Sequence, residues 1–110
     1  MIQRLAVVLN ESALTDLESI AAYILDSGGS ETIANSFVDR IKVRCRNIGN
    51  APRGGRSRHD IVPGLRTVPF EHSAIITYVV DGDLVRIVNI FYGGRDYETL
   101  MRDAGSSDPS

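Results

Sequence analysis

The feature that most restricts the fold of this chain is a pair of amphipathic segments joined by a very short link. Apolar residues recur at spacings of three and four in both segments, which is the period of one helix face. In the first segment they are Leu14, Leu17, Ala21, Ile24 and Leu25, and in the second they are Ile33, Ala34, Phe37, Val38, Ile41, Cys45 and Ile48. Two amphipathic helices with so short a link must pack antiparallel, as a helical hairpin.

The ends of both helices are marked by residues suited to capping. Asn10 or Ser12 can cap the first helix, and Ser30 can cap the second. Gly28 and Gly29 end the first helix because glycine readily adopts the left-handed conformation found there. Gly49, Asn50 and Pro52 end the second.

Three segments after the hairpin have the composition of β-strands: 65–70, 74–80 and 84–91. Asp81-Gly82 lies between valine-rich segments and predicts a two-residue type I′ turn, because both residue types tolerate a positive φ. The three strands should therefore form an antiparallel meander. Pro69 cannot donate a ladder hydrogen bond, so we expect a sheet edge or a bulge at that position.

The remaining segments complete the expected fold. Residues 2–9 are apolar on both faces, so we expect a strand that is covered on both sides, whereas 53–64 is rich in Gly, Pro and Arg and predicts an irregular loop with room for one short strand. Tyr97 to Met101 can form a short helix. We predict an α+β domain over residues 1–103, with the helical hairpin on one face of the sheet, and a disordered polar tail over 104–110.

Charge is strongly segregated along the chain. Residues 40–66 hold eight basic residues and one acidic residue, a net charge of +7, whereas the rest holds four basic and thirteen acidic residues, a net charge of −9. The bland interpretation is a solvated helix face followed by a flexible loop. The sharper one is a docking surface for an acidic partner, since eleven of the twelve basic residues are arginine, whose planar fork pairs with carboxylate or phosphate.

Several classes of function have little support in the sequence. One cysteine and two histidines do not make a zinc ligand set, and Arg53-Gly54-Gly55-Arg56 lacks the ending of a phosphate-binding P-loop. Cys45 lies on an apolar helix stripe, as a buried small residue would, and cannot form an internal disulfide. No apolar run approaches the length of a membrane helix. We therefore expect no metal, no cofactor and a cytoplasmic location.

Two glycine-containing segments are the best candidates for a site. In 55–66, Pro63-Gly64 predicts a tight turn, and Asp60 can accept hydrogen bonds from that turn or pair with an arginine. In 91–97, Gly93 and Gly94 end a strand and bring Arg95 and Asp96 to one end of the sheet, where we expect the two side chains to hold the corner. Either segment alone could be purely structural.

The order of these motifs resembles the ParE branch of the ParE/RelE toxins. The matching pieces are Asp60-Ile61-x-Pro63-Gly64-Leu65-Arg66, Ile76-Thr77-Tyr78 and Ile90-x-x-Gly93-x-Arg95-Asp96, together with Asp16-Leu17, Ile20, Tyr23-Ile24, Ala34 and Phe37 in the hairpin and Pro52 with Gly55-Arg56 after it. The resemblance runs from about residue 2 to residue 103. Tyr92 departs from it, because many relatives carry histidine there and tyrosine cannot act as an imidazole base near neutral pH.

The resemblance implies one half of a type II toxin–antitoxin pair, with the ParE/RelE toxin fold and a cognate ParD-like antitoxin as partner. ParE-like toxins poison DNA gyrase and do no chemistry themselves. The candidate partner-binding residues are Arg53, Arg56, Arg58, Arg66, Tyr92, Arg95 and Tyr97, and the structural residues are Asp60, Pro63, Gly64, Gly93, Gly94 and Asp96. The sequence does not indicate which residues would contact gyrase.

RelE-like relatives share the fold but cleave messenger RNA on the ribosome, which needs groups for proton transfer and phosphorane stabilisation. The side chains that could supply them are Arg66, His72, Arg86, Tyr92, Arg95 and Tyr97. A single lysine and a pI of about 5.6 make direct nucleic-acid binding a poor expectation, and the connection Glu71-His72-Ser73 lacks basic residues. A gyrase inhibitor is favoured over a nuclease, and a non-toxic binding module is the third alternative.

Overall fold

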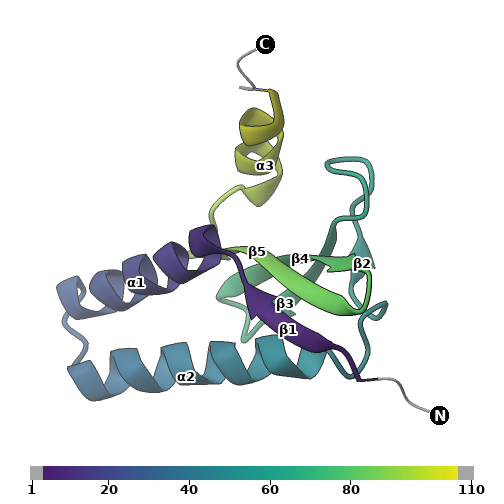
Figure 1. Ribbon diagram of the computed structural model, residues 1–110. Helices are drawn as coiled ribbons and strands as arrows, with labels where there is room; N and C mark the ends of the chain where they lie inside the picture. Colours follow the sequence, from purple (N-terminus) through teal and green to yellow (C-terminus); the bar gives the residue numbers. More distant parts are fainter. Residues whose placement is uncertain (1–3, 107–110) are drawn as a thin grey trace.

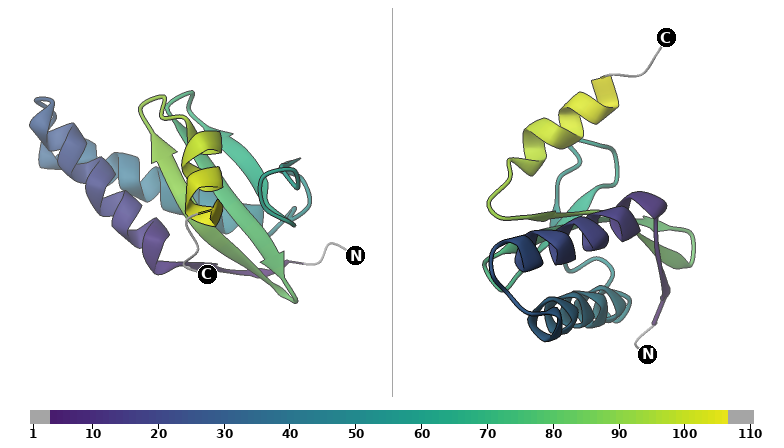
Figure 2. Two further views of the ribbon diagram at one scale, coloured as in Figure 1. Left: turned by 90° about the horizontal axis from the view of Figure 1, so that it is seen from above. Right: turned by 90° about the vertical axis from the view of Figure 1, so that its left-hand side faces the viewer.

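The computed structural model describes residues 4–106 and has the predicted α+β architecture. Its elements in chain order are β1 (Ala6–Leu9), α1 (Glu11–Asp26), α2 (Glu31–Ile48), β2 (Arg56–Ser57), β3 (Arg66–Phe70), β4 (Ala74–Asp81), β5 (Leu84–Tyr92) and α3 (Tyr97–Ser106). The helices α1 and α2 form the hairpin on one side of the sheet, and α3 stands on the other side (Figures 1 and 2).

The sheet has the order β1-β5-β4-β3-β2. The strands β3, β4 and β5 form the predicted antiparallel meander, and β2 is the short strand for which the loop had room. β1 pairs in parallel with β5, so the first and last strands of the chain are neighbours. β2 pairs only with Arg66 and Thr67 of β3, so Pro69 lies beyond the end of β2 on an open edge of the sheet. Of the two expectations for Pro69, a sheet edge or a bulge, the structure has the edge.

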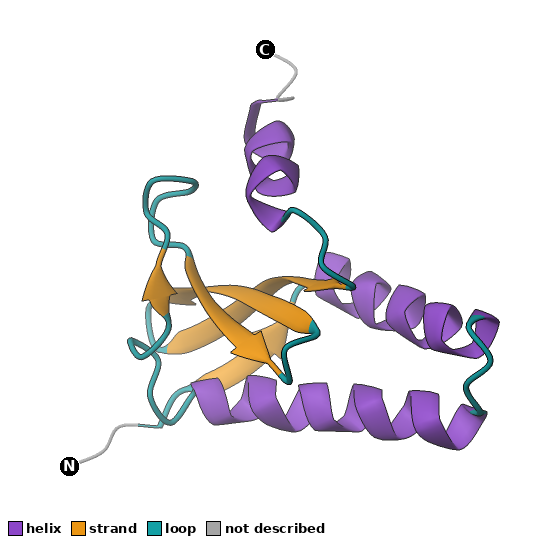
Figure 3. Cartoon of the chain, turned by 180° about the vertical axis from the view of Figure 1, so that it is seen from behind, coloured by secondary structure: helices purple, strands orange, loops and turns teal. Residues whose placement is uncertain are grey.

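The main core lies between the hairpin and the sheet. Both helices contribute buried residues at helical spacing: Ala13, Leu17 and Ile20 from α1, and Ala34, Phe37, Ile41, Cys45 and Ile48 from α2. Cys45 is fully buried, as its position on the stripe predicted. The prediction was wrong for Leu14, Leu25 and Ile33, which are exposed. The closed end of the hairpin extends past the sheet (Figure 3), so Leu25 and Ile33 find no sheet to cover them.

The expectation that the first strand is covered on both sides was also wrong. Leu5, Val7 and Leu9 pack against the main core, but Ala6 is exposed and Val8 is 39% exposed. The hairpin covers only one face of the sheet. The apolar cluster on the other face is built from α3, β4, β5 and the loop before β3, and it contains no described residue of β1. Ile2 lies outside the described residues.

Of the two tight turns of the meander, the one before β4 lies at Glu71-His72-Ser73 as predicted, and the one after β4 differs from the prediction. The two-residue loop after β4 is Gly82-Asp83 and not Asp81-Gly82, because Asp81 pairs with Leu84. Only Gly82 has a positive φ there, 62°, as in turns with glycine first. Positive φ at two successive residues, the signature of a type I′ turn, occurs instead at Glu71 and His72.

The helix ends follow the predictions in part. The Oγ of Ser30 accepts a hydrogen bond from the Ile33 amide (3.2 Å), and Gly28 has a φ of 96°. Asn10 occupies the first cap position without a side-chain cap bond. The terminal helix α3 continues past Met101 to Ser106. The first three residues of the predicted tail are therefore helical, and 107–110 lie outside the described residues.

Candidate functional site

The glycine-rich loop after α2 is organised around the hydroxyl of Tyr78. Tyr78 is fully buried on β4; its hydroxyl donates to the carbonyl of Pro52 (2.9 Å) and accepts from the amide of Gly55 (3.0 Å). The guanidinium of Arg66 donates to the carbonyl of Gly55 (2.9 Å) and to that of Arg53 (3.2 Å). A loop without regular structure is thus fixed by two side chains of the sheet.

Arg58 is the centre of a second network and not an exposed contact residue. It is only 7% exposed, and its guanidinium binds Asp60 (2.9 Å), Glu98 (2.7 Å) and the hydroxyl of Tyr97 (2.7 Å). Two of these partners belong to α3, so Arg58 joins the loop before β3 to the terminal helix. Its donors are engaged within the chain, and its predicted role in binding a partner stays a prediction.

The electrostatics of this Arg58 network favour the charged forms of Arg58, Asp60 and Glu98. The Arg58 hydrogen bond holds the pKa of Asp60 down at about 2, with Arg102 contributing from 3.3 Å. The same guanidinium lowers the pKa of Glu98, and hydrogen bonds to Asp60 and then Glu98 raise that of Arg58. The alternative in which Asp60 pairs with an arginine is the one the structure has.

At the corner between β5 and α3, Asp96 bonds to the helix and not to Arg95. One carboxylate oxygen of Asp96 accepts from the Thr99 amide (3.2 Å) and the other from the Thr99 hydroxyl (2.7 Å), so Asp96 caps α3. These hydrogen bonds hold the pKa of Asp96 below its usual value. The predicted pairing of Asp96 with Arg95 does not occur, because the carboxylate turns toward the helix amides. Gly93 and Gly94 both have a φ of 76°, which explains the glycine pair.

Tyr92 lies in an aromatic cluster on the hairpin side of the sheet. Its ring meets Tyr23 at 5.5 Å and Phe37 at 5.3 Å, both edge to face. Tyr23 and Tyr92 line two adjoining hollows, one along the hairpin and one that ends at Arg95. Tyr97, by contrast, lies on the opposite side of the sheet, near Phe91.

The remaining predicted residues are scattered. Pro63-Gly64 forms the predicted turn, with Gly64 at a φ of 81° and its amide donating to His59 Nδ1 (3.2 Å). His72 lies at the tip of the β3–β4 hairpin, whereas Arg86 lies toward the other end of β5 and pairs with Asp81 (3.2 Å). Arg53, Arg56 and Arg95 are exposed and make no ion pair with any described residue. The described part of the chain holds no cluster suited to a metal ion, and none of its helices is long and apolar enough to cross a membrane.

Residues 7–97 match the family model described as the ParE toxin of the type II toxin–antitoxin system parDE. The chain belongs to the ParE toxin family. No curated protein sequence matches it.

Two solved structures share the ParE toxin fold of this chain. One is described as the chromosomal ParDE TA system from P. aeruginosa, with a TM-score of 0.71, 22% identity, and coverage of 83% of this chain and 98% of the other. The second is a conserved hypothetical protein, HP0894, from Helicobacter pylori, with a TM-score of 0.51, 14% identity, and coverage of 80% and 93%. At these identities the likeness concerns the fold.

The structure of this ParE toxin also assigns roles to motif residues that the sequence left without one. Asp16 of α1 accepts hydrogen bonds from the Asn89 side chain (2.9 Å) and the Ile90 amide (2.8 Å), next to a register shift between β4 and β5. Tyr78 has the central loop-fixing role described above. The sequence did contain a signal for both roles. Asp16 is a carboxylate on the sheet-facing side of its helix and Tyr78 lies within an apolar strand, and buried polar groups must find hydrogen-bond partners.

Proposed function

We propose that this ParE toxin blocks replication by inhibiting DNA gyrase, without catalysing a reaction, and that a cognate ParD-like antitoxin neutralises it. The observation that carries the proposal is the dispersal of the groups that a nuclease would need to bring together. His72 lies at a hairpin tip, Arg86 toward the other end of β5, and Tyr92 and Tyr97 on opposite sides of the sheet. Acid–base catalysis needs such groups within hydrogen-bond reach of one substrate.

Two of the candidates, Tyr97 and Arg66, are also engaged in contacts within the chain, which supports the same proposal, whereas Arg95 is exposed and makes no ion pair with a described residue. The hydroxyl of Tyr97 accepts a hydrogen bond from Arg58, and the charge of Arg58 is balanced by Asp60 and Glu98. Arg66 donates to main-chain carbonyls of its own loop. A group that stabilises a phosphorane must instead be aimed at the place where the charge develops. With gyrase as the target, the toxin would act in the cytoplasm.

Two measurements made side by side test the gyrase proposal. The chain is induced alone in cells, and DNA breakage and messenger RNA half-life are followed. Purified protein is then mixed with gyrase and DNA in the absence of ribosomes. We expect trapped gyrase on cut DNA and unchanged messenger RNA. Codon-dependent cleavage on ribosomes that is abolished by Arg66→Ala or His72→Ala would instead make the protein a RelE-like nuclease, and harmless induction would favour a non-toxic binding module.

The antitoxin proposal is supported by the segregation of charge. Arg53 and Arg56 are exposed and unpaired among the described residues, within the segment that carries a net charge of +7. Complementary charge speeds association.

Reversing Arg53 and Arg56 to glutamate should therefore slow antitoxin association by about tenfold or more at low salt. An unchanged association rate in a stopped-flow or surface-binding measurement would contradict the charge argument. Arg58 is left out of the variant because it is buried.

A further inference from the structure

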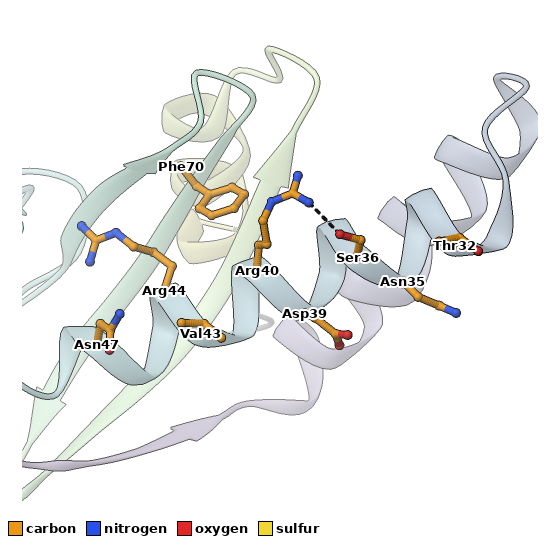
Figure 4. A pocket seen from close by; sticks show the side chains of 9 residues that line it. All are labelled: Thr32, Asn35, Ser36, Asp39, Arg40, Val43, Arg44, Asn47 and Phe70. Atoms are coloured by element: carbon orange, nitrogen blue, oxygen red, sulfur yellow. Dashed lines mark hydrogen bonds between the residues drawn. The ribbon is translucent and has the colours of Figure 1, made fainter.

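Two hollows beside the helical hairpin differ in what they offer a ligand. One has a volume of about 740 Å³ and follows α2, which supplies nearly all of its lining, with Phe70 on its flank (Figure 4). Its Arg40 is held by the hydroxyl of Ser36 (2.9 Å) and by Glu71 (2.8 Å). The other has a volume of about 320 Å³ and is lined by α1, β5 and the corner after β5, where Arg95 lies. Ligand sites are concave and enclose most of the ligand's surface, so the hollow with three walls, here called the Arg95 pocket, is the better candidate.

The apolar part of the Arg95 pocket consists of two isoleucines and two tyrosines. Ile20 and Ile90 are buried, Tyr92 is half-buried and Tyr23 is 57% exposed. The rings of Tyr23 and Tyr92 meet edge to face at 5.5 Å. A planar ring gains from burial of its apolar area and from edge-to-face contact with other rings. The pocket therefore favours an aromatic ring over an aliphatic chain.

The positive group of the Arg95 pocket is free. Arg95 is exposed and makes no ion pair with any residue that the structure describes. A guanidinium pairs with a carboxylate through two parallel hydrogen bonds. An anionic ligand would make a contact that the described chain leaves open, whereas the charge of Arg95 would repel a cationic one.

The negative group of the pocket, Asp16, uses only one of its two oxygens within the described chain. Its Oδ2 accepts from the side-chain amide of Asn89 (2.9 Å) and from the main-chain amide of Ile90 (2.8 Å), whereas no described residue donates to Oδ1. Both oxygens of a carboxylate accept hydrogen bonds, so a ring N–H would find an acceptor here. A phosphate would bring nearly two negative charges toward Asp16, and a carboxylate only one. The anion that fits is therefore a carboxylate.

We propose that the Arg95 pocket binds a small aromatic molecule that has an N–H donor on its ring and a carboxylate on a short arm. The ring packs against Tyr23 and Tyr92. Its N–H donates to Asp16, and the carboxylate pairs with Arg95. A volume of about 320 Å³ lies at the lower end of the range for ligand pockets, which suits one ring system with a short arm. Such binding goes beyond gyrase inhibition and needs neither gyrase nor an antitoxin.

The test is a binding measurement on the full chain with three probes. Indolepropionate has the ring N–H and the carboxylate, indolepropionamide lacks the charge, and naphthylpropionate has a ring system of similar size without the N–H. Titration followed by the amide signals in NMR spectra should give a Kd of about 1 mM or tighter for indolepropionate, as expected for a ligand of this size. Indolepropionamide should bind about tenfold more weakly and naphthylpropionate about fivefold more weakly, because each loses one polar contact.

Matched variants assign each contact of the probe. Arg95→Gln should weaken indolepropionate binding by about tenfold and leave indolepropionamide binding unchanged, whereas Arg53→Gln, at an exposed arginine outside the pocket, should change neither. Tyr23→Ala should weaken binding of both probes by about fivefold, and Leu25→Ala, at an exposed residue of α1 outside the pocket, should not.

A third variant examines the N–H contact. Asp16→Asn should remove the preference for indolepropionate over naphthylpropionate, because the amide can place a donor where the free oxygen was. Circular dichroism verifies that each variant is folded. If Asp16→Asn does not fold, the comparison of the two probes on the unchanged chain decides the same point.

The place of the ligand is read from the same spectra. Shifts centred on the amides of residues 90–95 support the proposal. Shifts centred on the α2 residues that line the hollow of Figure 4 would overturn it, as would equal affinity for all three probes or no binding of indolepropionate at about 10 mM. Since purified chain is used, none of these outcomes depends on whether the protein inhibits gyrase.

Discussion

Tyr78 illustrates how a single buried hydroxyl can order a loop that lacks regular structure. Its hydroxyl accepts a hydrogen bond from the amide of Gly55 and donates one to the carbonyl of Pro52. These two main-chain groups would otherwise lack partners within the loop. Gly55 must approach the ring closely to do so. A Cβ at this position would lie 2.9 Å from the Tyr78 ring and 3.0 Å from the carbonyl oxygen of Thr67. The glycine of this motif is therefore explained by packing.

Substitution of Gly55 tests that explanation. Gly55→Ala should lower the free energy of unfolding by about 1–3 kcal/mol, because overpacking shifts buried neighbours. Its control is Gly54→Ala, where the nearest atom, the carbonyl oxygen of Ala51, is 3.2 Å from the added carbon, so the overlap is smaller than at Gly55. Urea unfolding measures both. Equal stability of the two variants would show that the loop adjusts freely around Tyr78.

Asp96 makes a second residue-scale prediction. Asp96→Ala removes the cap of α3 and should lower the melting temperature by several degrees, since a lost N-cap weakens the first helical turn. Arg95→Ala, next to it, should leave the melting temperature unchanged because Arg95 is exposed and does not pair with Asp96. Thermal unfolding followed by circular dichroism compares the two. A larger effect of Arg95→Ala would instead support an Arg95–Asp96 ion pair at this corner, which the structure does not have.

At the scale of elements, α3 depends on a few contacts with the rest of the chain. Met101 is buried against Leu65 and Phe91, and Arg58 supplies the polar attachment through Tyr97 and Glu98. Few buried contacts make an element open more readily than the core does. The attachment of α3 should therefore respond to the charge state of the Arg58 network.

Acid should weaken this attachment. The pKa of Asp60 is lowered from 3.8 to about 2, and that of Glu98 is lowered as well. A depressed carboxyl pKa contributes stability that is present above the ordinary pKa and is lost as the pH falls through the folded-state pKa. We expect stability to fall between about pH 4 and pH 2, and Asp60→Asn to flatten that dependence.

Urea unfolding at several pH values measures the acid effect. Asp83→Asn is the control, since Asp83 is exposed in a turn and pairs with no described residue. The control should retain the wild-type pH dependence. A wild-type chain whose stability is constant down to pH 2 would show that the Arg58 network does not hold α3.

At the scale of the whole molecule, the layers separate two kinds of surface. The α1–α2 hairpin lies on one side of the sheet and α3 on the other (Figure 2). The hairpin side carries the Tyr23–Phe37–Tyr92 cluster, and the side of α3 carries the Arg58 network. A gyrase inhibitor needs an intact binding surface, whereas a nuclease needs an intact catalytic group. The two functions therefore respond differently to the same set of substitutions.

Growth arrest on induction distinguishes these responses. His72→Ala should leave toxicity unchanged, because His72 lies at a hairpin tip where water is not excluded from a reacting group. Substitutions of exposed residues between Tyr92 and Met101, such as Arg95→Ala, should reduce toxicity if this end contacts gyrase. The inducer concentration needed for growth arrest should then rise by about tenfold. Toxicity that is lost with His72→Ala and kept with every change at the carboxyl-terminal end would contradict the inhibitor proposal.

The sequence by itself determined which segments become helices and strands, and in what order. Spacings of three and four specified α1 and α2, the cap at Ser30 and the glycine at 28 specified their link, and apolar runs specified β3, β4 and β5. These signals are local, since they depend on neighbours within one turn or one strand. The order of the motifs also indicated the ParE family.

Only the tertiary structure decided which of those residues are buried and what the charges do. Leu25 and Ile33 have the right period but remain exposed because the hairpin outreaches the sheet. Arg58 was one more positive charge in a basic segment, and its acceptor Glu98 lies 40 positions away in the sequence. Burial and ion pairing depend on contacts between distant segments, and the spacing of residues along one element carries no information about them.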